Sequence, residues 1–223
     1  MGKTAFGGQI ARNVAESGKR VIFFSLEMSA PSLWQRWACP LVGVEWRQVI
    51  SGNITRDQKT KLIEQSKILS DRLAERLMIP DTPQTTETIW RIVATVRPDF
   101  IVVDHIRFLK DRADKETKRL GIITEALHDI AKAHDIPVMA LVQLNRDLTK
   151  RDIPRPTLAD IRDSGEVEEN ADNVWFLHRP DYYDDSVPKT QASRTEFIVA
   201  KFRNGPADVK VNLDFNLKQE WFE

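Results

Sequence analysis

The residues best suited to chemistry stand at the start of the chain, Met1-Gly2-Lys3-Thr4. Gly-Lys-Thr is the last part of a phosphate-binding loop, G-x-x-x-x-G-K-[ST]. In that loop backbone N–H groups surround the phosphates, the Lys contacts the β- and γ-phosphates, and the hydroxyl binds Mg²⁺. The first Gly of the pattern and a strand leading into it are absent from this sequence. Three residues match often by chance, so an ordinary helix start is the competing interpretation.

Three further polar residues follow short apolar runs: Glu27 after RVIFFS, Asp104 after FIVV, and Gln143 after IPVMALV. A carboxylate at the end of a strand can hold Mg²⁺ beside a triphosphate or polarise an attacking water. A neutral amide can sense a γ-phosphate and signal to a neighbouring loop. Each residue alone is equally well explained as a helix-start or strand-end group. Together with Gly-Lys-Thr, they favour a nucleotide hydrolase.

Apolar periodicity predicts alternating helices and strands. Helices are expected at 4–17, from a cap at Ser29 with Trp34, Trp37 and Leu41 on one face, and at 56–77, 86–96 and 120–134. Strands are expected at 20–25, 77–80, 99–105, 136–142, 173–177, 195–202 and 209–215, with loops at 110–118 and 147–160. The pair Asn204-Gly205 is typical of a tight hairpin turn. The pair Gly7-Gly8 in the first helix suggests close packing.

This order of elements predicts an α/β fold with a mostly parallel sheet and antiparallel hairpin strands at the C-terminal end. Ligands bind such sheets at the carboxyl ends of the strands. The phosphate-loop residues, Glu27, Asp104, Gln143 and the region of Lys201 to Arg203 are therefore expected to mark the functional edge.

Composition limits the function classes. The 223 residues contain 33 Lys+Arg and 33 Asp+Glu, so the net charge of zero gives no general attraction to nucleic acid or membrane, and any anion site must be local. The single cysteine, Cys39, excludes an internal disulfide and favours a cytoplasmic protein. Since no apolar run approaches the ~20 residues of a spanning helix, no membrane partner is expected.

Four longer motifs make the chain resemble the C-terminal motor domain of DnaB-type replicative DNA helicases, a hexameric RecA-like ATPase. The motifs are FFSLEMS at 23–29, QLNR at 143–146, IRDSG at 161–165 continuing to Asp172, and KFRNGP at 201–206. The resemblance covers Gly2 to about Phe215. It implies a RecA-like P-loop core, ATP and Mg²⁺ as cofactors, single-stranded DNA as a partner and a hexameric ring. A helicase loader and a primase are further possible partners by the same resemblance.

The resemblance also implies roles for individual residues. Gly2, Lys3 and Thr4 resemble the phosphate loop, with Thr4 and Asp104 on Mg²⁺. Glu27 resembles the catalytic glutamate and Gln143 the γ-phosphate sensor. Arg203, beside Lys201, resembles an arginine finger that reaches the nucleotide of a neighbouring subunit. Arg162, Asp163 and Gly165 match a loop that holds single-stranded DNA phosphates.

Two interpretations remain open at this point. In the first, residues 1–223 form a single RecA-like helicase ATPase domain that translocates on single-stranded DNA and unwinds duplex DNA during replication. In the second, the chain is an inactive or partner-dependent module, which binds DNA or other subunits but binds ATP poorly. The second follows from departures from the family pattern: the first strand, most of the phosphate loop and the N-terminal helicase domain are not in the sequence.

Overall fold

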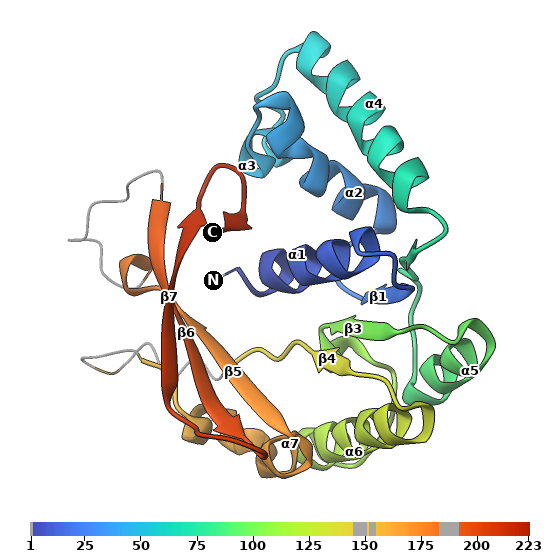
Figure 1. Cartoon of the computed structure of the whole chain (residues 1–223), viewed down its shortest axis with the longest axis vertical. Helices are drawn as coiled ribbons and strands as arrows, with labels where there is room; N and C mark the ends of the chain where they lie inside the picture. Colours follow the sequence, from blue (N-terminus) through green and yellow to red (C-terminus); the bar gives the residue numbers. More distant parts are fainter. Residues whose placement is uncertain (1, 145–150, 152–154, 183–191) are drawn as a thin grey trace.

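The computed structural model describes residues 2–144, 151, 155–182 and 192–223, with the backbone alone at 162–166 and 192. Its centre is a parallel four-stranded sheet, sheet A, with strand order β2-β1-β3-β4 (Figure 1). The strands are β1 (Val21–Ser25), β2 (Leu77–Met78), β3 (Phe100–Asp104) and β4 (Val138–Ala140). The parallel pairing of β1 with β3 and of β3 with β4 confirms the predicted α/β core.

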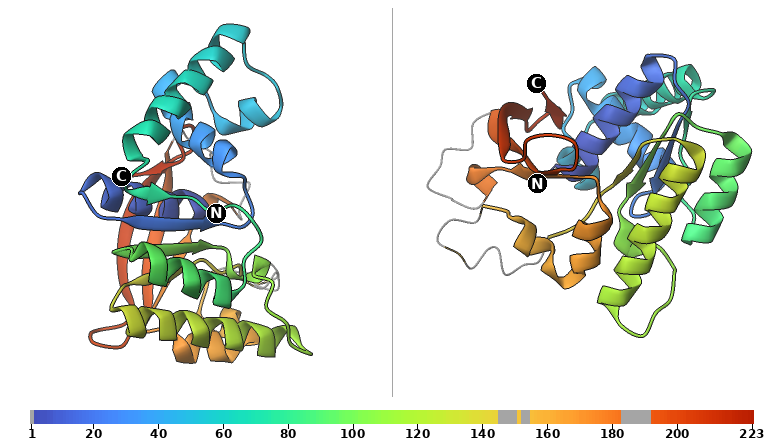
Figure 2. Two further views of the ribbon diagram at one scale, coloured as in Figure 1. Left: turned by 90° about the vertical axis from the view of Figure 1, so that its right-hand side faces the viewer. Right: turned by 60° about the horizontal axis from the view of Figure 1, so that its bottom comes forward.

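Two layers of helices cover sheet A because β1 and β3 are apolar on both faces. Phe23 and Val102 face α1 (Lys3–Glu16), α2 (Ala30–Ala38) and α4 (Arg56–Leu73). Phe24 and Val103 face α5 (Thr86–Val96) and α6 (Glu116–His134). In the left view of Figure 2, α2 and α4 lie above the sheet, and α5 and α6 below it. All five residues of each central strand are buried, as in parallel sheets generally.

The remaining part of the chain forms a second, antiparallel sheet, sheet B, with strand order β5-β6-β7-β8. Its strands are β5 (Asn173–His178), β6 (Ala192–Phe202), β7 (Val209–Asn216) and β8 (Trp221–Phe222). Val174, Phe176 and Ile198 join the core beneath α6, so the two sheets share one apolar layer. The short elements are η1 (Cys39–Val42), α3 (Trp46–Ile50), η2 (Ile106–Phe108), η4 (Leu158–Ser164), α7 (Gly165–Asn170) and η5 (Pro180–Tyr182).

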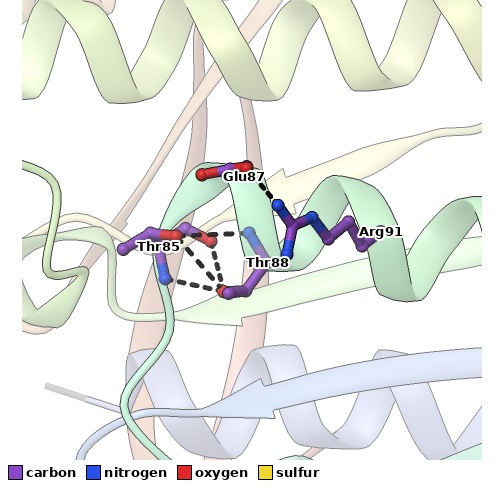
Figure 3. A network of polar contacts seen from close by, with 4 residues as sticks. All are labelled: Thr85, Glu87, Thr88 and Arg91. Atoms are coloured by element: carbon purple, nitrogen blue, oxygen red, sulfur yellow. Dashed lines mark hydrogen bonds and ion pairs between the residues drawn. The ribbon is translucent and has the colours of Figure 1, made fainter.

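Helix starts follow local capping signals in the sequence. Ser29 accepts a hydrogen bond from the Ser32 N–H at the start of α2. Thr85 and Thr88 form a reciprocal capping box on α5, shown in Figure 3 beside the ion pair between Glu87 and Arg91. These contacts satisfy N–H groups that otherwise lack a partner in the first turn of a helix. The predicted bounds of α5 are confirmed residue for residue.

Three predicted helix details are wrong. The helix from 56 ends at Leu73 instead of 77, because Leu77 is buried and pairs with Val21 in sheet A. The helix expected from 120 starts at Glu116, inside the expected charged loop. Leu41 is not on the face of Trp34 and Trp37: α2 ends at Ala38, the chain continues as a 3₁₀ turn, and Leu41 is 60% exposed.

Two details of the C-terminal strands also differ from prediction. The hairpin of β6 and β7 is confirmed, but its connection runs from Arg203 to Asp208, and the positive φ belongs to Asp208. The C-terminal strands form a sheet of their own. Among the described strands, β4 and β5 are edge strands and do not pair with each other. In the described part of the chain, none of the helices combines the length and apolar character that crossing a bilayer needs.

Candidate functional site

The carboxyl ends of β1 and β3 lie side by side. Ser25 is the register partner of Asp104, and the Leu26 N–H donates a hydrogen bond of 2.8 Å to the Asp104 carbonyl. The Ser25 hydroxyl donates to the Met28 carbonyl at 2.7 Å and closes the turn that carries Glu27. Strand register thus brings the predicted carboxylates Glu27 and Asp104 to one edge of sheet A.

The N-terminal end of α1 reaches the same edge. Gly2 precedes the helix with a φ of 97°, a left-handed conformation that glycine adopts without strain. A Cβ on Gly2 would lie 3.1 Å from the Phe222 ring, so β8 packs closely on the start of the helix. The Thr4 side chain lies near the Asp104 carboxylate and lowers its pKa. Residues 2–4 are therefore joined to the end of β3.

Charges at this edge perturb one another. Burial lowers the pKa of Lys3, and the nearby carboxylates of Asp104 and Glu27 partly oppose that shift. Burial raises the pKa of Asp104, against the effect of the Thr4 side chain, while Glu27 raises it further and Lys3 lowers it. Lys3, Thr4, Glu27 and Asp104 thus form one interacting cluster. Perturbed titratable groups at a strand-end edge are typical of functional sites.

This cluster has the composition of a phosphate and Mg²⁺ site. The N-terminus of a helix attracts anions, and the Lys3 ammonium adds a full positive charge there. The Thr4 hydroxyl and the Asp104 carboxylate are the hard oxygen ligands that Mg²⁺ prefers, and Thr4 is near enough to Asp104 to lower its pKa. Within the described ranges, no group of three or more His, Cys, Asp or Glu side chains could hold a metal alone. Substrate oxygens and water are the ligands that would complete such a Mg²⁺ shell.

Two residues without a predicted role in the site also lie near the cluster. His105 is 7% exposed and packs against Phe108, with ring centroids 4.5 Å apart and the rings tilted by 43°. Burial is the main cause that lowers its pKa. Arg36, from the last turn of α2, lowers the pKa of Asp104 and forms an ion pair with Glu220 in the β7–β8 turn. The position of Arg36 follows from the packing of α2. For His105, the sequence feature that could have indicated a place in the site is its position directly after Asp104.

Gln143 lies at the same end of sheet A, but it is exposed and forms no hydrogen bond or ion pair with the cluster among the described residues. It follows β4 by three positions. Leu141, two residues earlier, is held by backbone hydrogen bonds to Val103 and Ile106 and packs on Gly7 of α1. The backbone before Gln143 is therefore tied to α1 and β3.

Lys201 and Arg203 lie at another place, where β6 ends beside α7. The Lys201 ammonium donates to the Glu168 carbonyl at 2.6 Å, near the C-terminal end of α7. Arg203, directly after β6, forms an ion pair of 2.5 Å with Asp172, and both side chains are about half exposed. Neither cation contacts the cluster around Lys3 in the described structure.

The three residues predicted to bind DNA lie on η4 and α7. Arg162 and Asp163 fall in η4, and Gly165 begins α7. The side chains at 162–166 lie outside the described residues. The start of η4 is fixed by the buried Asp160, which accepts hydrogen bonds from Arg151 at 2.6 and 3.1 Å and from the Thr157 N–H at 2.7 Å.

Comparison with known proteins identifies relatives of the whole chain. The family described as DnaB-like helicase C-terminal domain matches residues 1–223. "Replicative DNA helicase DnaC" of Bacillus subtilis (strain 168) is 34% identical over 215 residues, covering 92% of this chain and 46% of the relative. "Replicative DNA helicase DnaB" of Geobacillus stearothermophilus is 35% identical over 216 residues, with the same coverage of 92% and 46%. The chain thus spans about half the length of these curated relatives.

Solved structures agree with this assignment. "ATPase Domain of G40P" superposes with a TM-score of 0.85 and 28% identity, covering 100% of this chain and 80% of that one. "The Structure Of A DnaB-Like Replicative Helicase And Its Interactions With Primase" gives the same TM-score and identity, covering 100% of this chain and 54% of that one. The KaiC-like protein PH0186 of Pyrococcus horikoshii OT3, at 17% identity and a TM-score of 0.58, shows the shared fold alone.

Proposed function

The chain belongs to the family of DnaB-like helicase C-terminal domains, and on that premise we propose that it is the ATP-driven motor of a replicative DNA helicase. In this proposal residues 1–223 form one RecA-like domain that acts in the cytoplasm, translocates on single-stranded DNA and unwinds duplex DNA. The observation that carries the proposal is the gathering of Lys3, Thr4, Glu27 and Asp104 at one sheet edge. An ammonium, a hydroxyl and two carboxylates at a helix N-terminus suit hydrolysis of a nucleoside triphosphate.

The residues of the cluster have distinct proposed roles. The backbone at Gly2 and the Lys3 ammonium bind the β- and γ-phosphates of ATP, and the Thr4 hydroxyl and Asp104 hold Mg²⁺. When bound, Mg²⁺ neutralises negative charge on the phosphates. The Glu27 carboxylate accepts a proton from the water that attacks the γ-phosphorus, and the exposure of Glu27 leaves room for that water.

The remaining predicted residues link hydrolysis to DNA and to a neighbouring subunit. Gln143 senses the γ-phosphate from the segment after β4. Arg203, supported by Lys201, stabilises charge on the nucleotide of the next subunit in a hexameric ring, which suits its half-exposed place away from Lys3. Arg162, Asp163 and Gly165 contact DNA phosphates, which carry no sequence information and therefore suit a motor. A primase and a helicase loader are proposed partners, the former supported by the similar helicase whose title names primase.

The test compares the chain with a version extended at its N-terminus through a complete G-x-x-x-x-G-K-T loop. We expect the extended version to bind a fluorescent ATP analogue more tightly and to hydrolyse ATP faster with single-stranded DNA. In that version Glu27→Gln should keep nucleotide affinity and lose turnover, whereas Lys3→Ala should lose both. If Glu27→Gln retains turnover, the proposed site is wrong.

A further inference from the structure

A groove of about 260 Å³ opens between α1, the end of α2 and the β7–β8 turn. Its walls combine the apolar side chains of Trp37, Pro40, Leu41 and Trp221 with the polar Gln219, and Arg12 and Glu223 are its charged residues. None of these residues belongs to the proposed nucleotide cluster. Figure 1 shows the end of the chain at β8 lying next to α1 and α2, which is where the groove lies.

The Arg12 guanidinium lies between two indole rings. Its Cζ atom is 4.9 Å from the centroid of the Trp221 ring and 5.9 Å from that of Trp37. Cation–π contact of this kind covers the flat faces of a guanidinium and leaves the N–H groups at its edge. The Nε atom is fully buried and has no hydrogen-bond partner, and no described residue accepts a hydrogen bond from this guanidinium.

The acidic side chains around Arg12 form no ion pair with it among the described residues, although the charge of Glu16 partly opposes the lowering of the Arg12 pKa by burial. Glu16, one turn further along α1, forms an ion pair of 2.7 Å with Arg72. Glu220 forms an ion pair with Arg36. Glu223, in the lining of the groove, makes no ion pair with Arg12 in the described structure. A buried Nε–H without an acceptor is unfavourable, so an anionic group that approaches Arg12 would stabilise the site.

The size and charge of the groove restrict what can occupy it. Its volume lies below the ~300–1,000 Å³ typical of small-molecule and cofactor pockets, and it is sufficient for one or two side chains. Arg12 is a single cation, and Glu223 shares the groove with it. A nucleic-acid strand needs a row of cations to follow its phosphates. A single carboxylate, by contrast, matches the paired N–H edge of one guanidinium.

We propose that this groove binds a short peptide segment of a partner protein that presents a carboxylate side chain next to an apolar one. The carboxylate accepts hydrogen bonds from Arg12, and the apolar neighbour packs on Trp221 and the exposed Leu41. This inference does not depend on ATP hydrolysis or on a ring. It identifies the partner by chemistry alone.

The experiment uses the full chain labelled with ¹⁵N and follows the indole N–H signals of its six tryptophans. The probes are acetyl-Leu-Glu-Leu-amide, its Gln counterpart and sodium acetate. We expect the Glu peptide to shift the Trp37 and Trp221 signals saturably, with a Kd on the order of 1 mM. Loss of the charged hydrogen bonds should make the Gln peptide about tenfold weaker or more. Acetate, which lacks the apolar contacts, should bind more weakly than the Glu peptide.

Two variants locate the binding site. Arg12→Gln should remove the preference for Glu over Gln, and Leu41→Ser, at an exposed wall residue, should weaken the Glu peptide without changing the fold. Arg47→Gln, an exposed arginine on α3 outside the groove, is the matched control and should leave binding unchanged. Equal binding of the Glu and Gln peptides, equal binding of acetate, or insensitivity to Leu41→Ser would each overturn the proposal.

Discussion

Gln9 and Phe222, 213 positions apart, are joined as neighbouring strands are: the Gln9 amide donates to the Phe222 carbonyl at 2.7 Å and accepts from the Phe222 N–H at 2.8 Å. A side chain of α1 thus completes the backbone pairing of β8. The same helix begins at the proposed phosphate loop, where the Phe222 ring packs on Gly2. The last strand therefore holds the end of the first helix where we propose that nucleotide binds.

Replacing Gln9 with Ala removes both hydrogen bonds and leaves two backbone groups of β8 without protein partners. We expect a loss of about 1–3 kcal/mol in the free energy of unfolding, measured by urea denaturation. Gln9→Glu keeps the acceptor alone and should give an intermediate loss at neutral pH. Asn13→Ala, at an exposed position on the same helix, is the control and should change stability by less than about 0.5 kcal/mol. If Gln9→Ala and Asn13→Ala have the same free energy of unfolding, the hydrogen bonds between Gln9 and β8 do not stabilise the folded protein.

Gly8 lies where α1 crosses the Trp37 side chain. A Cβ at this position would be 2.8 Å from ring atoms of Trp37, whereas real contacts of this kind are longer. Gly8→Ala gains ~1 kcal/mol of helix propensity but forces overpacking that costs ~1–3 kcal/mol, so we expect it to be neutral or to destabilise by up to about 2 kcal/mol. In a Trp37→Phe background, which removes the indole atoms concerned, the same change should stabilise. If the effects of Gly8→Ala and Trp37→Phe on the free energy of unfolding are additive, the close contact between Gly8 and Trp37 is contradicted.

Asp99 connects the start of β3 to the start of β1. Its carboxylate accepts a hydrogen bond of 2.8 Å from the Arg20 N–H, which lowers its pKa, and Lys19 adds a smaller effect. Because the pKa of Asp99 is lower in the folded than in the unfolded state, the unfolded protein takes up a proton at Asp99 first as the pH falls below 3.8. Wild type should therefore gain stability over Asp99→Asn as the pH rises to and above the ordinary carboxyl value of 3.8, and lose that advantage in stronger acid.

The measurement for Asp99 is the difference in urea midpoint between wild type and Asp99→Asn from pH 2.5 to 6. Asp71→Asn, at an exposed position on α4, controls for the loss of one surface charge. A difference that stays constant over this range, or that grows as the pH falls, would refute the assigned role of the Arg20 hydrogen bond.

Arg203 separates a ring motor from a scaffold that only binds nucleotide. In the version with a complete phosphate loop, Arg203→Ala should leave ATP binding nearly intact and reduce hydrolysis by about 10³-fold or more. Mixing this variant with Lys3→Ala should restore part of the activity, because one subunit then supplies the arginine and its neighbour the lysine.

The matched control for Arg203 is Asp172→Asn, which breaks the same ion pair and keeps the arginine. If Arg203 acts only through Asp172, both variants will have the same small effect, within about 0.5 kcal/mol of stability. Loss of turnover without rescue on mixing would place Arg203 in the site of its own subunit.

The sequence predicted those parts of the fold that depend on apolar runs or on short local motifs. The runs of Val, Ile and Phe predicted β1 and β3, and parallel pairing then placed Glu27 beside Asp104. The Gly-Lys-Thr signal predicted where α1 begins. These predictions succeeded because a strand that is buried on both faces is a nearly continuous apolar run, which is easily recognised in the sequence.

The patterns failed where distant contacts decide the structure. The first turn of α6 is charged and looked like a loop, but Arg119 there donates to the carbonyls of Leu109 and Arg107 and pairs with Glu116. Arg36 reaches the cluster around Asp104 only because α2 packs against α1 and the β7–β8 turn. Neither contact has a signature within its own segment, so only the folded structure identifies it.

The distance in sequence between Gln9 and Phe222 has a consequence for biosynthesis. At ~5–20 residues per second, a ribosome needs roughly 10–40 s to add the residues that separate them. During that time Phe6 and Gln9 of α1 lack the strand that covers them in the finished protein. The proposed nucleotide site can therefore reach its final form only late in synthesis, which makes the first helix of the chain one of the last elements to be fully secured.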